Sequence, residues 1–148
     1  MNFPSVFLIC CFCVVGLSLR AGDAVAVGYN SARVWTMVTY YSSSTAKGGA
    51  DYKNSSEARQ AALRDLRRRA GESLVKSDVI AASDLTTYAV VARAETREGK
   101  DVIVVGYGKS GAEAEKKATD DLKRKEATAK QKIMYRYFSH GADSVAKP

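Results

Sequence analysis

Few residues in this sequence could carry chemistry, and two of the acidic ones recur at a fixed spacing. Asp65 and Asp121 lie 56 positions apart, and a pair of carboxylates is what a small glycoside hydrolase uses. Each is followed three residues later by an arginine, Arg68 and Arg124, so ion pairing along a helix face explains both. The single histidine, His140, has no nucleophile at a recognisable spacing. We therefore expect a non-catalytic protein without a cofactor, and a carboxylate-dependent hydrolase is the alternative.

The segment Gly108-Lys109-Ser110 has the sequence of the end of a phosphate-binding loop. Such a loop needs a glycine five residues before the glycine of its Gly-Lys pair, so that backbone N–H groups can surround the phosphates. Ile103 occupies that position, inside an apolar run, which argues against a nucleotide-triphosphate site. A glycine turn with a capping serine explains the motif, and a weaker anion site at a helix N-terminus beside Lys109 stays open.

Basic residues gather near the ends of two predicted helices, and the chain carries a formal net charge of +7. Cations near a helix C-terminus offset the macrodipole by about 0.3–1 kcal/mol each, which is one explanation of the pattern. The other is a surface that binds anionic lipid heads, acidic polysaccharide or nucleic acid. The candidate anion-binding residues are Arg64, Arg67, Arg68, Arg69, Lys109, Lys123, Arg124 and Lys125.

Three aromatic residues, Trp35, Tyr40 and Tyr41, form a second candidate surface, for binding a protein. They precede a Ser/Gly-rich stretch, residues 42–54, and aromatic side chains beside a long loop are typical of interaction surfaces. The pattern of residues 34–41 predicts a strand with Trp35 and Tyr41 on one face and Tyr40 on the other. One face must belong to the core, so we expect part of this set to be buried.

Residues 1–24 have the layout of a secretory signal peptide. The apolar run from Phe7 to Leu19 is shorter than the roughly 20 residues that cross a bilayer, and Gly22 and Ala24 place small residues at positions −3 and −1 of a cleavage site. All three cysteines lie inside this run. We therefore expect a secreted or periplasmic protein whose mature part has no cysteine, no disulfide and no membrane span. An uncleaved membrane anchor is the alternative.

The elements that must position these residues form an internal repeat. Residues 56–69 and 112–125 are identical at six of fourteen positions, namely Glu57/Glu113, Ala58/Ala114, Ala62/Ala118, Asp65/Asp121, Leu66/Leu122 and Arg68/Arg124. Each segment carries an apolar stripe of alanine and leucine at helical spacing. Strand-like runs surround both helices in the same order, with strands expected at 24–27, 34–41 and 74–81 and then at 88–94, 102–105 and 133–138.

This order predicts an α+β domain with pseudo-twofold symmetry. Neither half could bury its apolar stripe alone, so we expect a single domain at 25–148 made of two ββαβ repeats, 25–84 and 85–140, with a short C-terminal tail. The expected architecture has two layers, a mostly antiparallel sheet with both helices on one face.

The segment Ala24-Val25-Ala26-Val27-Gly28 follows the export signal and leads into a second strand. A helix then begins with Glu-Ala or Ala-Glu and reaches Ala-x-x-x-Leu, and the order is repeated once. This resembles a bacterial family of small secreted domains of unknown function built from tandem strand-strand-helix repeats, over most of residues 24–125. The resemblance implies an exported, non-catalytic interaction domain and supplies no active site. The family usually carries paired cysteines, which the mature part of this chain lacks.

Residues 88–125 also resemble the closing part of the double-stranded-RNA-binding domain, through a hairpin, a Gly-x-Gly-x-Ser segment and a basic helix. Glu113 and Glu115 fall where that family's helix begins with lysines that meet phosphates, and the family's first helix is missing. The expected partner is therefore a protein or an anionic surface rather than nucleic acid.

Overall fold

The computed structural model describes residues 22–42 and 54–140. The first half contains β1 (Asp23–Tyr29), β2 (Trp35–Ser42), α1 (Ser55–Ala70), the short 3-10 turn η2 (Gly71–Ser73) and β3 (Lys76–Ser83). The second half contains β4 (Thr86–Thr96), β5 (Asp101–Gly108), α2 (Gly111–Arg124) and β6 (Ala127–His140). The predicted order of strand, strand, helix and strand is confirmed in both halves. Residues 1–21 of the predicted signal peptide, which include the cysteines, and residues 43–53 of the predicted loop lie outside the described residues.

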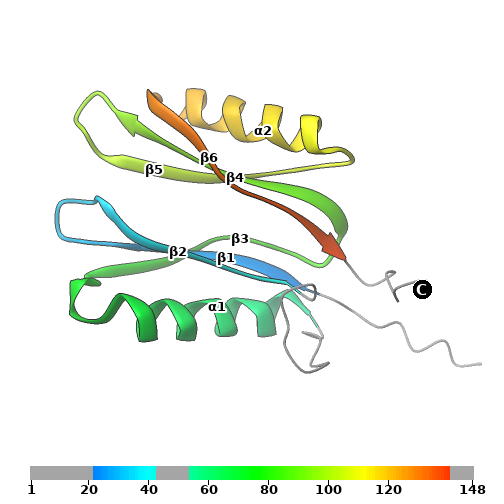
Figure 1. Cartoon of the computed structure of the whole chain (residues 1–148), viewed down its shortest axis with the longest axis horizontal. Helices are drawn as coiled ribbons and strands as arrows, with labels where there is room; N and C mark the ends of the chain where they lie inside the picture. Colours follow the sequence, from blue (N-terminus) through cyan, green and yellow to red (C-terminus); the bar gives the residue numbers. More distant parts are fainter. Residues whose placement is uncertain (1–21, 43–53, 141–148) are drawn as a thin grey trace, which may run out of the picture.

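Each half builds its own three-stranded antiparallel sheet, with the first strand of the half at its centre. The strand orders are β2-β1-β3 and β5-β4-β6. Figure 1 shows four layers in the order α1, first sheet, second sheet, α2. The predicted α+β class is confirmed. The layering differs from the prediction, because the helices cover the outer faces of two stacked sheets instead of one face of a single sheet.

The central strands explain the four layers, because both of their faces are apolar. In β1, Ala24 packs against α1, whereas Val25 and Val27 face the second sheet. In β4, Ala92 packs under α2 and Val91 faces the first sheet. A strand that is apolar on both faces must be covered on both. In β1, the small alanines therefore lie on the helix side of the sheet and the larger valines lie between the sheets.

Helices α1 and α2 begin at the caps that the sequence predicts. Asn54 Oδ1 accepts a hydrogen bond from the backbone N–H of Glu57 at 3.0 Å, and Ser110 Oγ accepts one from the N–H of Glu113 at 3.2 Å. After α1, Gly71 takes a φ of 55°, a backbone conformation that favours glycine and ends a helix. Capping chemistry therefore fixes the helix positions locally in both halves.

The two halves lie side by side with matching ends. At one end, Asp23 at the start of β1 contacts Tyr107 of β5 and Tyr137 of β6. At the other, Trp35 at the start of β2 contacts Asp101 at the start of β5. We call these the Asp23 end and the Asp101 end. Figure 1 shows that α1 and α2 both run from the Asp23 end toward the Asp101 end.

Candidate functional site

The basic residues at the two helix ends lie at the same end of the molecule. Because α1 and α2 run in the same direction on opposite outer layers (Figure 1), 67–69 and 123–125 both fall at the Asp101 end. All six of these cationic side chains are exposed. Between the helices, the hairpin loops add exposed Arg33 and Arg97. Since stacked sheets lie about 10 Å apart and a helix is about 10 Å across, this row of charge spans about 30 Å.

The half of the molecule toward the Asp101 end carries the excess positive charge of the described residues. Its fourteen cations are Arg33, Arg64, Arg67, Arg68, Arg69, Lys76, Arg93, Arg97, Lys100, Lys123, Arg124, Lys125, Lys130 and Lys132. Its nine acids are Asp65, Glu72, Asp78, Glu95, Glu98, Asp101, Asp120, Asp121 and Glu126, which leaves a balance of +5. In the half toward the Asp23 end, five cations and five acids cancel among the described residues. The molecule is therefore electrically polarised along its strands.

Part of this charge is paired along the helices. Arg68 and Arg69 both bind Asp65, at 2.6 and 2.9 Å, and Arg124 binds Asp121 at 3.1 Å. The predicted helix-face pairing is thus confirmed. Burial would raise the pKa of Asp65, but the hydrogen bonds from Arg68 and Arg69 outweigh it and lower that pKa below its usual value. The exposed helix-end cations that make no ion pair with any described residue are Arg67, Lys123 and Lys125.

Lys109 lies beside the N-terminus of α2, at the opposite end of that helix from this row, whereas Arg64 lies on α1 next to the row. The backbone N–H of Lys109 donates to Glu113 Oε2 at 2.9 Å, and Lys117 pairs with the other oxygen of Glu113 at 2.7 Å. A carboxylate of the chain itself therefore occupies the α2 N-terminus, where the sequence suggested a weak anion site. Arg64 is exposed within α1, about one turn before the basic helix end.

The three aromatic candidates are partly buried, and a bulge divides them between two faces. The register of β1 and β2 shifts between Gly28 and Tyr29. As a result, Trp35 faces the second sheet together with Tyr40, whereas Tyr41 packs beneath α1. The sequence pattern placed Trp35 and Tyr41 on one face. That prediction was wrong, because strict alternation takes no account of a residue inserted by a bulge.

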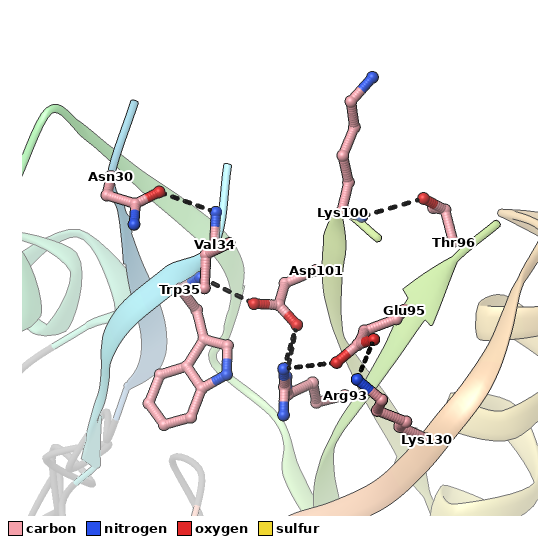
Figure 2. A network of polar contacts seen from close by, with 9 residues as sticks. All are labelled: Asn30, Val34, Trp35, Arg93, Glu95, Thr96, Lys100, Asp101 and Lys130. Carbon is pink, nitrogen blue, oxygen red and sulfur yellow. Dashed lines mark hydrogen bonds and ion pairs between the residues drawn. The ribbon is translucent and has the colours of Figure 1, made fainter. Parts of the chain in front are cut away.

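A polar network joins the two sheets at the Asp101 end (Figure 2). Asp101 Oδ2 accepts the backbone N–H of Trp35 at 3.0 Å, and Oδ1 accepts Nε of Arg93 at 2.5 Å. Arg93 also pairs with Glu95 at 3.1 Å, and Glu95 pairs with Lys130 at 2.9 Å. The guanidinium carbon of Arg93 lies 5.5 Å from the centroid of the Trp35 ring, within cation–π range. The contacts of Asp101 and Arg93 with Trp35 therefore join the two sheets, and the ion pairs of Arg93 with Glu95 and of Glu95 with Lys130 lie within the second sheet.

A second polar cluster joins the sheets at the Asp23 end. Asp23 has no exposed surface, and its Oδ2 accepts the hydroxyls of Tyr137 and Tyr107 at 2.7 and 3.1 Å. Burial raises the pKa of Asp23, against the weaker opposing effect of hydrogen bonds from Tyr137, Tyr107 and nearby Ser83 and Ser139. Its Oδ1 makes no hydrogen bond with any described group. Burial also raises the pKa of both tyrosines, so their hydroxyls remain donors.

Sequence reasoning missed this cluster, because Asp23 falls inside the predicted signal peptide. The partners of Asp23 are tyrosines, and Asp65 and Asp121 lie on opposite outer layers. None of these three acids therefore forms a carboxylate pair facing a common substrate. The described residues contain no group of three histidine, cysteine, aspartate or glutamate side chains placed to hold a metal ion. Within the same residues, no helix combines the length and apolar character that crossing a membrane requires.

Comparisons with protein-family models, with curated proteins and with solved structures find no match to this chain. The two resemblances drawn from the sequence rest on short motifs and stay predictions. The interpretation of the site therefore depends on the placement of its charges.

Proposed function

We propose that this chain is an exported, non-catalytic binding domain that attaches to an anionic surface through the Asp101 end. The observation that carries the proposal is the common direction of α1 and α2, which brings both basic helix ends to one end of the molecule. Offsetting a macrodipole requires cations at the C-terminus of each helix, but it does not require the two termini to share an end. Their shared position makes one cationic surface out of two separate patches.

The partner that fits this surface is broad and flat, such as a membrane with acidic headgroups. Exposed cations come from all four layers, at two helix ends and two hairpin loops. A row about 30 Å long can meet such a surface at several points together. Each lysine or arginine near an anionic membrane contributes about 1 kcal/mol. The three helix-end cations without an ion pair, Arg67, Lys123 and Lys125, would then contribute about 3 kcal/mol in all.

Co-sedimentation of the exported chain with lipid vesicles tests the proposal. We expect binding to vesicles that contain phosphatidylglycerol and none to vesicles of phosphatidylcholine alone. Added salt should weaken the binding, since exposed charges are screened over about 8 Å at physiological ionic strength. Retention on heparin over the same salt series shows whether the chain binds a linear polyanion as tightly as it binds an acidic membrane surface. Equal binding to both vesicle types, or none to the acidic vesicles at low salt, would contradict the proposal.

A further inference from the structure

One side of the stacked sheets carries two strand edges that pair with no other described strand. β5 is an edge of the second sheet and β3 is an edge of the first, and these two strands lie against each other. The remaining edges, β2 and β6, lie together on the opposite side, where the ring of Tyr40 stacks on that of Tyr137. An open edge presents backbone N–H and C=O groups that can pair with a further strand.

The edge of β5 lacks the features that usually prevent such pairing, which are charged side chains, prolines and bulges. Between Asp101 and Lys109 it reads Val-Ile-Val-Val-Gly-Tyr-Gly, without a charge or a proline, and its pairing with β4 shows no register shift. β6, the other edge of the same sheet, carries Lys130, Lys132 and Arg136, and its register with β4 shifts at three places. β5 is therefore the edge of this sheet that can accept another strand.

Charged side chains on α2 form a stripe beside the edge of β5. Their helical spacing places them on one flank of the helix, and their charges alternate along it. We call this the α2 stripe, and its members are Glu113, Lys117, Asp120 and Arg124. The last three line a groove together with residues 105–107 of β5, and Glu113 lines the pocket that adjoins it at Tyr107. The α2 stripe therefore faces whatever pairs with β5.

An alternating order of charges is complementary to the same order reversed. When two copies of α2 run in opposite directions side by side, Glu113 of one copy meets Arg124 of the other and Lys117 meets Asp120. Each contact then occurs twice, because a twofold axis relates the copies. Lys117 already pairs with Glu113 along α2 at 2.7 Å, but ammonium and carboxylate groups can each make more than one such contact. Antiparallel pairing of two β5 edges produces this arrangement of the helices.

The helix and the strand share the centre that such a pairing needs. A Cβ atom at Gly106 would lie 2.1 Å from the carbonyl oxygen of Ala114 and 3.0 Å from the Cβ atom of Ala118. The middle of the α2 stripe therefore lies over the middle of β5, near Val105. A twofold axis at this point relates the two strand edges and the two α2 stripes by one operation.

Exposed apolar side chains at the two ends of β3 fit the same axis. Val75 is 68% exposed and Leu85 is 71% exposed, the largest fractions among the large hydrophobic side chains that the structure describes. They lie equally far along the chain from Ile80, near the middle of β3. β3 and β5 both run from the Asp101 end toward the Asp23 end. A twofold axis near Val105 therefore brings Val75 of one copy toward Leu85 of the second copy.

We propose that this chain forms a dimer with a second copy of itself through antiparallel pairing of the two β5 edges. The second sheet then continues from one copy into the other, with the two α2 stripes side by side. Because the pairing is antiparallel, the two Asp101 ends point away from each other, and each stays free to bind an anionic surface. This inference goes beyond the proposed function and does not depend on it.

Sedimentation equilibrium of the purified chain over a concentration series tests the dimer. Lys117→Glu with Arg124→Glu makes the α2 stripe wholly acidic, and Glu113→Lys with Asp120→Lys makes it wholly basic. All four side chains are at least 39% exposed, so circular dichroism should show a retained fold. We expect the wild type to dimerise, and each double variant alone to dimerise at least about a hundredfold more weakly, since like charges then face each other. An equimolar mixture of the two variants should dimerise again.

Three results would overturn the proposal: a wild type that stays monomeric over the whole series, a double variant that dimerises alone as tightly as the wild type, or a mixture that stays monomeric. The first would leave the β5 edge to a peptide strand of another protein. Lys130→Glu with Arg136→Glu is the matched control, because it makes the same change of charge on exposed side chains of β6. It should leave the dimer unchanged.

Hydrogen exchange of the wild type at low and high concentration gives a second measurement that depends on the backbone alone. We expect the amides of β5 to exchange more slowly at the higher concentration, because half of them gain a partner strand. The amides of β6 should exchange at the same rate at both concentrations. Protection of β6 in place of β5, or loss of the dimer in the β6 control, would also overturn the proposal.

Discussion

Tyr137, near the end of β6, donates its hydroxyl to the buried carboxylate of Asp23 on β1 at 2.7 Å, across the interface between the two sheets. At the opposite end of the same interface, Asp101 accepts the backbone N–H of Trp35 at 3.0 Å. Between these contacts the sheets meet through apolar side chains such as Val91. Two polar contacts therefore bracket an apolar interface, and they fix how one half lies on the other.

Removal of the Tyr137 hydroxyl tests the first of these contacts. We expect Tyr137→Phe to lower the free energy of unfolding by about 1–2 kcal/mol, because it takes a hydrogen bond from a buried carboxyl group. Tyr135→Phe is the matched control on the same strand, since Tyr135 is 37% exposed. Urea unfolding of both variants measures the difference. A loss of equal size in Tyr135→Phe would show that the contact with Asp23 contributes nothing specific.

The raised pKa of Asp23 predicts how stability depends on pH. The folded chain holds this proton more tightly than the unfolded chain, so the stabilisation is complete below the usual aspartate pKa and is lost as pH rises through the raised value. We expect the free energy of unfolding of the wild type to fall, relative to Asp23→Asn, as the pH rises above the usual aspartate pKa of about 4. Urea midpoints over a pH series measure both chains, and parallel profiles would contradict the prediction.

Neutralising Asp101 tests the contact at the other end. The Asp101 side chain is 1% exposed and is shared between Arg93 and the backbone N–H of Trp35. We expect Asp101→Asn to cost about 2–3 kcal/mol, since it leaves a half-buried guanidinium without its closest partner. Glu98→Gln, which breaks an exposed pair with Lys100, should change stability by less than about 1 kcal/mol. Thermal unfolding of the two variants compares them, and similar shifts would refute a special role for Asp101.

Gly106 on β5 tests how closely α2 lies on its sheet. A Cβ atom there would lie 2.1 Å from the carbonyl oxygen of Ala114. We expect Gly106→Ala to destabilise the chain by about 2 kcal/mol or more, because the helix must move away from the strand. Gly111→Ala, where an added Cβ atom would meet no other part of the described chain within 4 Å, should be neutral or stabilising by up to about 1 kcal/mol. Chemical unfolding of both chains measures this, and equal stability would mean that α2 can shift freely.

Local features of the fold could be predicted from the sequence, whereas the layering could not. Asn54 and Gly71 marked the bounds of α1, because capping depends on residues near in the chain. The alternation of alanine and valine in β1 was visible, but which of them faces a helix depends on what covers each face. The last strand was predicted at 133–138, yet it begins at Ala127. A positive φ of 50° at Lys130 interrupts its regular pattern.

The candidate site was predictable in composition but not in arrangement. Arg67 and Lys123 were recognised as helix-end cations, and their position at one end of the molecule follows only from the matching direction of the two halves. The bulge in β2 moved Trp35 between the sheets, although nothing in its neighbours signals an extra residue. Asp23 was overlooked, because residues beside an export signal are read as part of that signal.

The most direct test of the central claim compares two variants of equal net charge. In each variant, three cations are replaced by glutamine. The first variant changes Arg67, Lys123 and Lys125 at the Asp101 end. The second changes Arg59, Lys109 and Lys116 toward the Asp23 end. Affinity for phosphatidylglycerol vesicles at physiological salt is the measurement. We expect about a hundredfold loss in the first variant and a change within about twofold in the second, at about 1 kcal/mol for each cation near the membrane. An equal loss in both would show that only total charge matters and would contradict binding through the Asp101 end.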